Sequence, residues 1–388
     1  MNLRNHKTVT ERRKALEKER AVSLKHTGSF TLDESIAGMR NCENMIGITQ
    51  VPLGIAGPLT MKTINDERLM MNDFYIPLAT TEGALVASVN RGCKAIVESG
   101  GAIVGGHRIG ATRGPVFRVK DLKESTMLHN LFRERFVELK TVAEKTSHHL
   151  TLTKISSKGV GRYHYARFVF DTQDAMGLNM VTIATDAIVA HIKQKTGIAC
   201  ISLSGNYCVD KKPAWQNVIN ARGIEVWAEV VLKEKTLADV LKTSAQKVYD
   251  VWLAKCMMGS AVSGSMAFNA QYANIVAAIF LATGQDIAHV VEGSLGITTT
   301  EVEGRNLYIS IHMPDLMVGT VGGGTGLATQ KEALTLLGVF GGDHGKNALH
   351  FAEIVGAAVL AGEISLLASL SIGTLAQSHS RLGRGAKE

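Results

Sequence analysis

The chain has 388 residues, of which 45% are hydrophobic and 20% are charged, and its net charge is +7. This length exceeds the size of most single hydrophobic cores, so it predicts two domains, and the ordinary composition excludes an intrinsically disordered protein. The positive charge is compatible with nucleic acid, a membrane surface or a phosphorylated small molecule, and it does not choose among them.

Other features of the composition narrow these classes. Basic residues gather at both ends, in residues 4–25 and 381–387, where no aromatic residue is available to stack on bases. The five cysteines form no CxxC or Cys/His pattern, which predicts reduced thiols and no metal site. The sequence predicts neither a signal peptide nor a membrane-spanning helix. We therefore expect a cytoplasmic protein that binds neither nucleic acid nor a membrane.

The first hundred residues predict two helices. Residues 9–25 read as an exposed, charged helix within an N-terminal helical segment, residues 1–40. A second helix begins at Thr81, which can cap it, and ends before Gly100. Glu82 is therefore expected in the first turn of this helix.

The spacing of apolar residues changes in the next part of the chain. Its apolar residues alternate with a period of two, as in strands, on both sides of one helical stretch, which predicts an α+β domain inserted into the chain. Beyond it, apolar residues at helical spacing predict two long helices. The expected strands are residues 116–119, 150–154 and 163–170, and the expected helices are residues 131–143, 266–282 and 347–361, the last continuing toward residue 370.

Glycines in residues 322–326 offer a partial GxG pattern of a dinucleotide-binding turn, with Asp343 at a suitable distance for a ribose contact. A Rossmann unit needs a parallel strand leading to that acid, whereas residues 340–345 predict a loop between helices. A nicotinamide cofactor would therefore bind on another architecture. A glycine turn without a ligand is the alternative.

Residues 204–213 combine small, polar and charged side chains beside an apolar run. Most lysines are solvated surface residues, and Lys211 and Lys212 can be read in that way. A lysine held near an acyl carbonyl can instead stabilise a developing oxyanion, while its neighbour pairs with a substrate carboxylate.

Glu82 and Asp286 lie at opposite ends of helix dipoles. Glu82 lies at a predicted helix start, where the field is positive, and Asp286 lies just beyond a predicted helix end, where the field is negative. The first field favours ionised Glu82, and the second disfavours ionised Asp286. For Glu82 to donate a proton at neutral pH, burial or a carboxylate such as Asp286 must outweigh a dipole effect of about 0.3 to 1 kcal/mol. A helix-dipole glutamate and a loop aspartate are the structural alternatives.

His379 lies close to the C-terminus, and a histidine in such a place is usually solvated. A protonated imidazole nevertheless has the acidity to protonate a departing thiolate.

Several long motifs follow one another in an order that is typical of one enzyme family. They are residues 43–47 (ENMIG), 52–59 (PLGIAGPL), 80–88 (TTEGALVAS), 112–115 (TRGP), 174–180 (DAMGLNM), 204–213 (SGNYCVDKKP), 282–286 (ATGQD), 319–325 (GTVGGGT) and 378–379 (SH). Through them the chain resembles the soluble class of 3-hydroxy-3-methylglutaryl-coenzyme A (HMG-CoA) reductases, found in archaea and in the catalytic portion of the eukaryotic enzymes.

The resemblance implies a four-electron reduction. Two molecules of NADPH, with NADH as the alternative, deliver hydride in turn and convert the thioester through a thiohemiacetal and an aldehyde to mevalonate. The implied catalytic residues are Lys211, which stabilises the oxygen anion, Glu82 and Asp286, which supply protons with it, and His379, which protonates the departing coenzyme A.

The resemblance also assigns binding residues. The free carboxylate of the substrate would be held by Arg113, Ser204, Lys212 and Lys255, with Asp210 supporting the lysines. The cofactor would lie along Asp174, Met176, Gly177, Leu178 and Asn179, with Val321 and Gly322 nearby.

The implied fold is α+β, with a large, mainly helical substrate-binding domain in residues 41–114 and 203–375. A small α+β domain, ferredoxin-like and not Rossmann-like, would be inserted at residues 115–202 and bind the cofactor. Residues 376–388 would form a C-terminal flap. The family places its active site at a subunit interface, so a homodimer or larger homo-oligomer is implied.

Three positions depart from the family pattern. Gln173 stands where a glycine commonly precedes the DAMG motif, and Gly385 stands where the animal enzyme has a phosphorylatable serine. His148 stands near a position where relatives can offer arginine to the 2′-phosphate of NADPH, and a neutral histidine discriminates only weakly. Two other functions stay open on the sequence: NAD-linked oxidation of mevalonate and nucleic-acid binding by the N-terminal charges.

Overall fold

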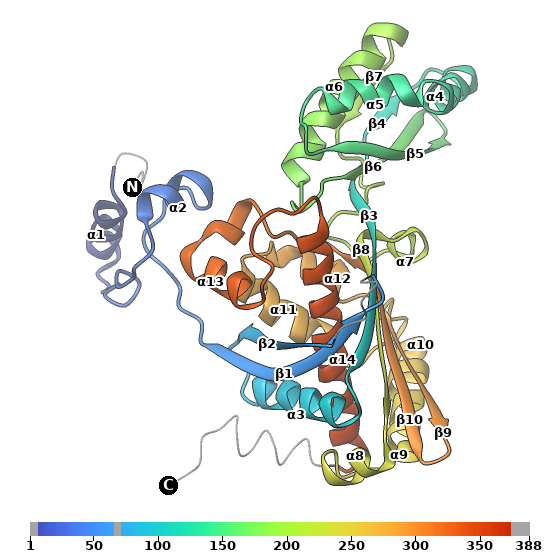
Figure 1. Cartoon of the computed structure of the whole chain (residues 1–388). Helices are drawn as coiled ribbons and strands as arrows, with labels where there is room; N and C mark the ends of the chain where they lie inside the picture. The colour runs from blue at the N-terminus through green and yellow to red at the C-terminus, as the bar shows by residue number, and fades with distance from the viewer. Residues whose placement is uncertain (1–6, 66–70, 374–388) are drawn as a thin grey trace.

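Apolar side chains gather into two main cores in the computed structural model, which describes residues 7–65 and 71–373. The larger core lies between a long sheet and the helices packed on it, and we call this part the large body. The smaller core lies within residues 116–202, which we call the small body, with Ala111 and Met317 joining it from the large body. Figure 1 shows the small body at one end of the molecule, so the chain is an α+β protein in two packed parts.

The N-terminal segment forms two helices, α1 (Val9–Arg20) and α2 (Glu34–Arg40). Thr8 and Glu11 form a capping box at the start of α1. The predicted helix over residues 9–25 is thus confirmed in part, and it stops early because Ala21 adopts a left-handed backbone conformation.

The large body is built on a sheet that the sequence did not predict. Antiparallel strands follow the order β3, β8, β10, β9, with β1 parallel to β3 and β2 antiparallel to β1. Buried and more exposed side chains alternate along β8, which is typical of a strand with one face on the core. The strands are β1 (Leu53–Thr63), β2 (Asn72–Ala79), β3 (Ala102–Arg113), β8 (Arg222–Leu232), β9 (Ile297–Glu303) and β10 (Asn306–Leu316).

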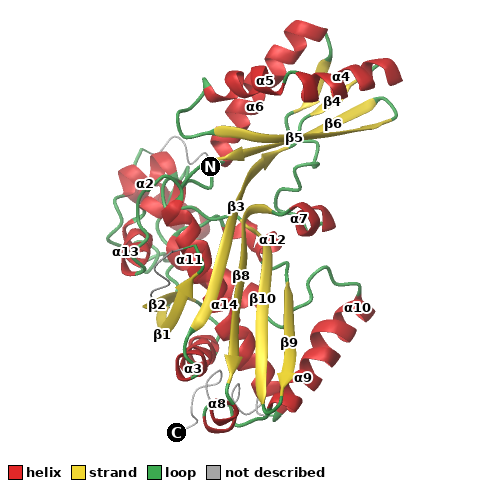
Figure 2. Ribbon diagram, turned by 45° about the vertical axis from the view of Figure 1, so that its right-hand side comes forward, coloured by secondary structure: helices red, strands yellow, loops and turns green. Residues whose placement is uncertain are grey.

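Three long helices contribute apolar side chains to the large core. They are α3 (Leu85–Glu98), α11 (Tyr272–Thr283) and α14 (Lys346–Ser371). In the described part of the chain, α14 alone has the length and composition to cross a membrane, but 83% of its most apolar window is buried within the protein. It runs behind the strands in Figure 2 and is the central core helix. It continues to Ser371, as the sequence indicated.

The small body contains the predicted strands of the inserted segment, and it also contains helix α6 and strand β7, which the sequence did not predict. One predicted helix, residues 131–143, is in fact two helices that meet at Arg135. The elements are β4 (Val116–Arg118), α4 (Leu122–Glu134), α5 (Phe136–Glu144), β5 (Thr151–Val160), β6 (Tyr163–Asp171), α6 (Leu178–Thr196) and β7 (Ala199–Ser202), with strand order β7, β4, β6 and β5 paired to β6.

One strand belongs to both bodies. The first part of β3 pairs with β8, and its last residues, Ala111 to Arg113, pair with β6 of the small body. The change of partner follows Gly110, whose φ of +113° and close approach to the Phe170 carbonyl favour glycine.

Short elements connect these parts. They are α7 (Trp215–Asn220), α8 (Glu234–Asp239), α9 (Ala245–Trp252), the π-helix η2 (Leu253–Gly259), α10 (Ser260–Ser263), the 3₁₀-helix η3 (Ile287–His289), α12 (Val290–Gly293), the 3₁₀-helix η4 (Gly323–Gly326) and α13 (Ala328–Leu336).

Candidate functional site

The structure brings together two of the predicted catalytic residues. Lys211 Nζ lies 2.6 Å from Asp286 Oδ2, and the two side chains are 38% and 40% exposed. Asp286 follows the end of α11 and caps η3, where its Oδ1 accepts a hydrogen bond from the Ala288 N–H at 3.1 Å. An ammonium group and a carboxylate, each partly exposed, are thus paired at the protein surface.

The charge state of Asp286 differs from the sequence expectation. Burial by itself would raise the pKa of Asp286, but hydrogen bonds from Lys211 and Ala288 and the charge of His289 outweigh it, so the pKa is lowered. The expectation that the end of α11 disfavours the ionised carboxylate is therefore wrong, because Asp286 also begins the next helix and faces a cation. Asp286 is ionised at neutral pH.

The loop that carries Lys211 has an unusual backbone. Asn206, Val209 and Lys211 all have positive φ angles, of 61°, 52° and 56°. Such conformations cost non-glycine residues about 1 kcal/mol or more each, so contacts elsewhere must hold them. The Gly205 N–H donates to the Gly114 carbonyl at 2.6 Å, and Asn217 Nδ2 donates to the Val209 carbonyl at 3.0 Å.

A buried arginine lies beneath this loop. Arg222, whose side chain is fully buried, donates to Asp210 Oδ1 at 2.6 Å and to Glu292 Oε1 at 2.8 Å. Its Nε donates to Thr112 Oγ1 at 2.8 Å. Glu292 Oε1 also accepts from the backbone N–H of Lys211 at 3.1 Å. Arg222 therefore ties together β3, the lysine loop and the segment that follows Asp286.

Three members of this cluster could in principle hold a metal ion. Ligand atoms of Asp210, His289 and Glu292 lie within 4.8 Å of one another. Two of these atoms, Asp210 Oδ1 and Glu292 Oε1, already accept hydrogen bonds from the guanidinium group of Arg222. The cation of this cluster is therefore Arg222, and the donor set does not fit a metal.

The predicted substrate-binding residues fall into two groups. Arg113 lies at the end of β3 with Nη1 4.0 Å from Asp210 Oδ2, and its Nε is buried without a hydrogen-bond partner. Ser204 and Lys212 are exposed on the same loop as Lys211. Lys255 is exposed on the π-helix η2, and no contact joins it to the others within the described residues. Ser204, Asp210 and Lys212 thus share one loop, Arg113 lies next to this loop through Asp210, and Lys255 lies on a separate element.

Glu82 and His379 are not brought into this pair by the described residues. Helix α3 begins at Leu85 after the left-handed Ala84, so Thr81 does not cap it and Glu82 does not lie in its first turn, contrary to the sequence expectation. Glu82 is exposed, and its backbone N–H donates a hydrogen bond to Thr80 Oγ1 at 3.0 Å. His379 lies outside the described residues.

The two predicted cofactor segments do lie against each other. Ala175 forms a parallel bridge with Val321, and the Thr320 N–H donates to the Asp174 carbonyl at 2.8 Å. A Cβ on Gly319 would come within 2.6 Å of the Met176 nitrogen, so the close approach requires glycine. The first segment contains Met176 and Gly177 and continues into the start of α6 at Leu178 and Asn179, and the second contains Gly322.

Asp174 has a specific place in this arrangement. Its buried carboxylate accepts hydrogen bonds from the backbone N–H groups of Asp343 and Gly345 at 2.7 Å each, and of Ala348 at 3.0 Å. These donors belong to the start of α14 and the loop before it, so Asp174 fastens the cofactor segment to the core helix. Its side-chain oxygens are occupied by this contact.

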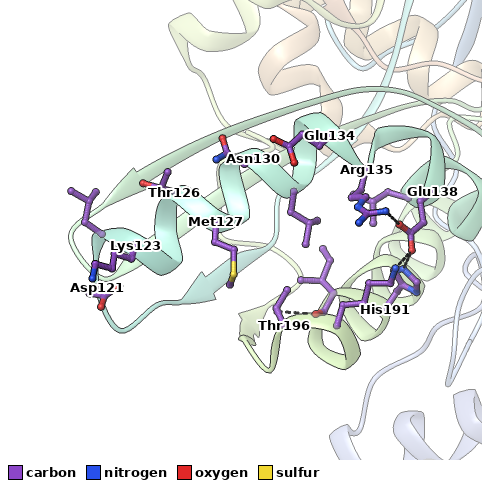
Figure 3. A pocket seen from close by; sticks show the side chains of 15 residues that line it. Asp121, Lys123, Thr126, Met127, Asn130, Glu134, Arg135, Glu138, His191 and Thr196 are labelled. Atoms are coloured by element: carbon purple, nitrogen blue, oxygen red, sulfur yellow. Dashed lines mark hydrogen bonds and ion pairs between the residues drawn. The ribbon is translucent and has the colours of Figure 1, made fainter.

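A separate hollow of about 1040 Å³ lies on the helices of the small body. Figure 3 shows Glu138 at one end of it, joined to His191 by a 2.8 Å contact and to Arg135 at 3.8 Å. These charged groups pair with one another, and none of the predicted catalytic or binding residues lines the hollow. The chemistry therefore concentrates around Lys211 and not here.

Comparison with known proteins agrees with this geometry. The profile of the hydroxymethylglutaryl-coenzyme A reductase family matches residues 8–384. The chain belongs to this family. A 3-hydroxy-3-methylglutaryl-coenzyme A reductase of Methanocaldococcus jannaschii is 52% identical over 385 residues, which covers 97% of this chain and 93% of that protein. The reductase of Aeropyrum pernix is 50% identical over 378 residues, covering 96% and 89%.

A solved structure extends the likeness to the fold. The class II HMG-CoA reductase from Streptococcus pneumoniae, bound to NADPH in open conformations, matches with a TM-score of 0.68 at 17% identity, covering 94% of this chain and 98% of that chain. The resemblance inferred from the motifs is thus confirmed, and the chain is an HMG-CoA reductase family oxidoreductase of the mevalonate pathway.

Several residues of the candidate site were not indicated by the sequence. Arg222, Glu292, His289 and Asp315 are buried charged or titratable residues around Asp210. The available signal was an ionisable group inside an otherwise apolar segment, as in residues 287–292, which is costly unless a partner is present. Sequence alone does not tell which distant residue is that partner.

Proposed function

We propose that this HMG-CoA reductase converts HMG-CoA to mevalonate and free coenzyme A with two molecules of NADPH. The overall change consumes two hydrides and two protons, so the site must hold a carbonyl oxygen and supply protons to it. The paired Lys211 and Asp286 carry the proposal, because an ammonium group held by an ionised carboxylate can donate to an oxygen that becomes negative.

In this proposal Lys211 Nζ donates a hydrogen bond to the substrate carbonyl oxygen and stabilises its negative charge as each hydride arrives. Asp286 keeps the ammonium group oriented and shares its proton. Glu82 acts with them as a proton donor, and His379 protonates the departing thiolate, both by analogy with the family motifs.

The free carboxylate of the substrate would bind to Arg113, Ser204 and Lys212. The buried Arg113 Nε without a partner supports this role, since a buried donor is normally satisfied and a bound carboxylate would satisfy it. Asp210 holds the other side of the same guanidinium group at 4.0 Å.

Lys255 would reach the substrate across a subunit interface. It is exposed, and so are the apolar side chains of Leu253, Met258 and Val262 around it. Exposed apolar side chains gathered in this way are typical of a surface that another subunit covers. We therefore propose that the chain forms a homodimer, or a larger homo-oligomer, with the active site at the subunit interface.

The cofactor would bind where the small body meets the large body. Helix α6 begins after Gly177 without a side-chain cap, so its first backbone N–H groups can receive a phosphate. Met176, Leu178 and Asn179 would line one side and Val321 and Gly322 the other. NADPH supplies hydride when it is bound, and the chain orients it against Lys211.

The proposed domains follow from these roles. Residues 41–114 and 203–375 would bind the substrate, residues 115–202 would be a ferredoxin-like cofactor-binding domain, and His379 would act from residues 376–388, outside the described part of the chain. We propose a cytoplasmic location for the assembled enzyme.

The purified protein mixed with HMG-CoA and NADPH should consume the reduced cofactor, with two molecules oxidised per mevalonate formed. Protein without substrate and the Lys211→Ala variant serve as controls. No loss of reduced-nicotinamide absorbance with either NADPH or NADH would refute the proposal. Faster turnover of mevalonate with NAD than of HMG-CoA with NADPH would assign the oxidative direction instead.

A further inference from the structure

His289 lies directly behind the proposed catalytic pair. Its side chain is fully buried, Nδ1 lies 2.6 Å from Glu292 Oε1, and Nε2 lies 3.7 Å from Asp286 Oδ2. We infer that His289 stores a proton behind Asp286 and passes it to Asp286 during turnover. This inference rests on the proposed function and adds a positioning and proton-relay residue to it.

The contact with Glu292 determines which nitrogen carries a hydrogen. Glu292 Oε1 accepts hydrogen bonds from Arg222 Nη1 at 2.8 Å and from the Lys211 N–H at 3.1 Å, in addition to His289. An oxygen that receives two such donors is the ionised acceptor, so His289 Nδ1 is the donor in the third contact. Nδ1 therefore keeps its hydrogen throughout.

The other nitrogen faces an acceptor. His289 Nε2 is buried and has no hydrogen-bond partner, and Asp286 Oδ2 is ionised. A bare Nε2 would place two lone pairs opposite each other, whereas a protonated Nε2 places an N–H opposite a carboxylate. A shift of about 1 Å from 3.7 Å would bring the two atoms to hydrogen-bond distance.

The charged groups around His289 balance one another. The carboxylates of Asp210, Glu292 and Asp286 face the ring, and the cations Arg222, Lys211 and Arg113 pair with these carboxylates. Asp315 contacts Arg222, and burial raises the pKa of Asp315 to about 8. A hydrogen on Nε2 is therefore favoured by the carboxylate oxygen of Asp286 that faces it.

The reaction gives this proton a use. The overall change consumes two protons. One stays on the former carbonyl oxygen and the other goes to the departing thiolate, because the thiohemiacetal returns its hydroxyl proton when it collapses to the aldehyde. The Lys211 and Asp286 pair therefore needs one new proton in each turnover. In the relay the Nε2–H bond of His289 breaks and an O–H bond forms on Asp286 Oδ2, which leaves neutral His289 with its Nδ1–H still on Glu292. Between turnovers a proton from solvent returns to Nε2 through Asp286, whose side chain is 40% exposed.

The test compares the pH dependence of kcat in the wild-type enzyme and in His289→Gln and His289→Asn variants. A Gln or Asn amide can keep a hydrogen bond to Glu292 or to Asp286, but neither amide passes a proton. We expect kcat of both variants to be about 10-fold below wild type at pH 6, with KM for HMG-CoA and NADPH within twofold. The ratio should approach one as the pH rises, because the relay operates only while Nε2 carries a proton.

A purely structural role would give a ratio that does not change with pH, or a variant that matches wild type at every pH, and either result would overturn the relay. His312→Gln is the matched control, because His312 Nε2 lies 2.8 Å from Glu225 Oε1 on the sheet, away from Asp286. It should keep the wild-type profile. A wild-type protein without reductase activity would instead refute the proposed function, so the two failures are distinguishable.

Discussion

Asp174→Asn separates a structural carboxylate from one that contacts the cofactor. In the wild-type protein Asp174 Oδ2 accepts two backbone N–H groups, from Asp343 and Gly345, and Oδ1 accepts a third, from Ala348. An asparagine keeps one carbonyl oxygen for two of these donors but turns an NH₂ group toward the third. The negative charge at the start of α14 is also lost.

These losses set the expected size of the effect. A hydrogen bond to a charged group contributes about 1.5 to 3 kcal/mol, and a charge at a helix N-terminus contributes about 0.3 to 2 kcal/mol. Because Asp174 is only 3% exposed, solvent cannot replace the lost partner. We expect the free energy of unfolding to fall by about 3 kcal/mol in Asp174→Asn, with weaker NADPH binding as a consequence.

Urea unfolding of the cofactor-free protein, followed by circular dichroism, measures this change. The matched control is Asp343→Asn, whose side chain is 50% exposed and 3.8 Å from Lys346, and it should stay within about 0.5 kcal/mol of wild type. If Asp174→Asn unfolds at the wild-type urea concentration and loses only NADPH affinity, the carboxylate acts on the cofactor directly and the reasoning is refuted.

Three further predictions concern catalysis, stability and cofactor choice. Lys211→Ala should lower kcat by about 10²- to 10³-fold with little change in coenzyme A affinity, and steady-state kinetics showing unchanged turnover would remove Lys211 from the mechanism. Burial raises the pKa of Asp315 to about 8, so its contribution to stability is full below about pH 4 and is lost as the pH rises to 8. The asparagine of Asp315→Asn does not titrate. Between pH 5 and 8 the free energy of unfolding of the wild type should therefore fall relative to that of the variant by about 1 kcal/mol per pH unit. Urea midpoints of the two proteins that keep a constant difference over this range would contradict this. The exposed His148→Arg should lower KM for NADPH by about 2- to 5-fold and leave KM for NADH unchanged, and an equal change for both cofactors would show that residue 148 does not meet the 2′-phosphate.

The sequence predicted the parts of the fold whose signal is local. The terminal core helix, the strands of the small body and the helix before Asp286 all have periodic apolar residues, and each is present. The sheet of the large body was not predicted, because its strands pair residues far apart in the chain, such as Ile309 with Val230. The start of α3 was misplaced because Thr81 has the chemistry of a cap but the backbone turns at Ala84.

The residues of the candidate site were likewise predicted only in part. The motifs indicated Lys211 and Asp286, and the structure pairs them. The buried partners Arg222, Glu292 and His289 follow only from the packing of β8 against the segment after α11. The sign of the Asp286 pKa shift was wrong on the sequence, because a helix field of a few tenths of a kcal/mol is weaker than a direct contact with an ammonium group.

Strand β3 makes the two bodies mechanically dependent. Its last residues, Thr112 and Arg113, pair with β6 and so belong to the small body. Arg222, which donates a hydrogen bond to Thr112, lies on β8 in the large body. A rotation of the small body about Gly110 therefore displaces Arg113 relative to Lys211 and pulls on the Thr112 contact. If the two bodies have the roles proposed above, a movement that opens the cofactor side would also weaken the contacts to a substrate carboxylate.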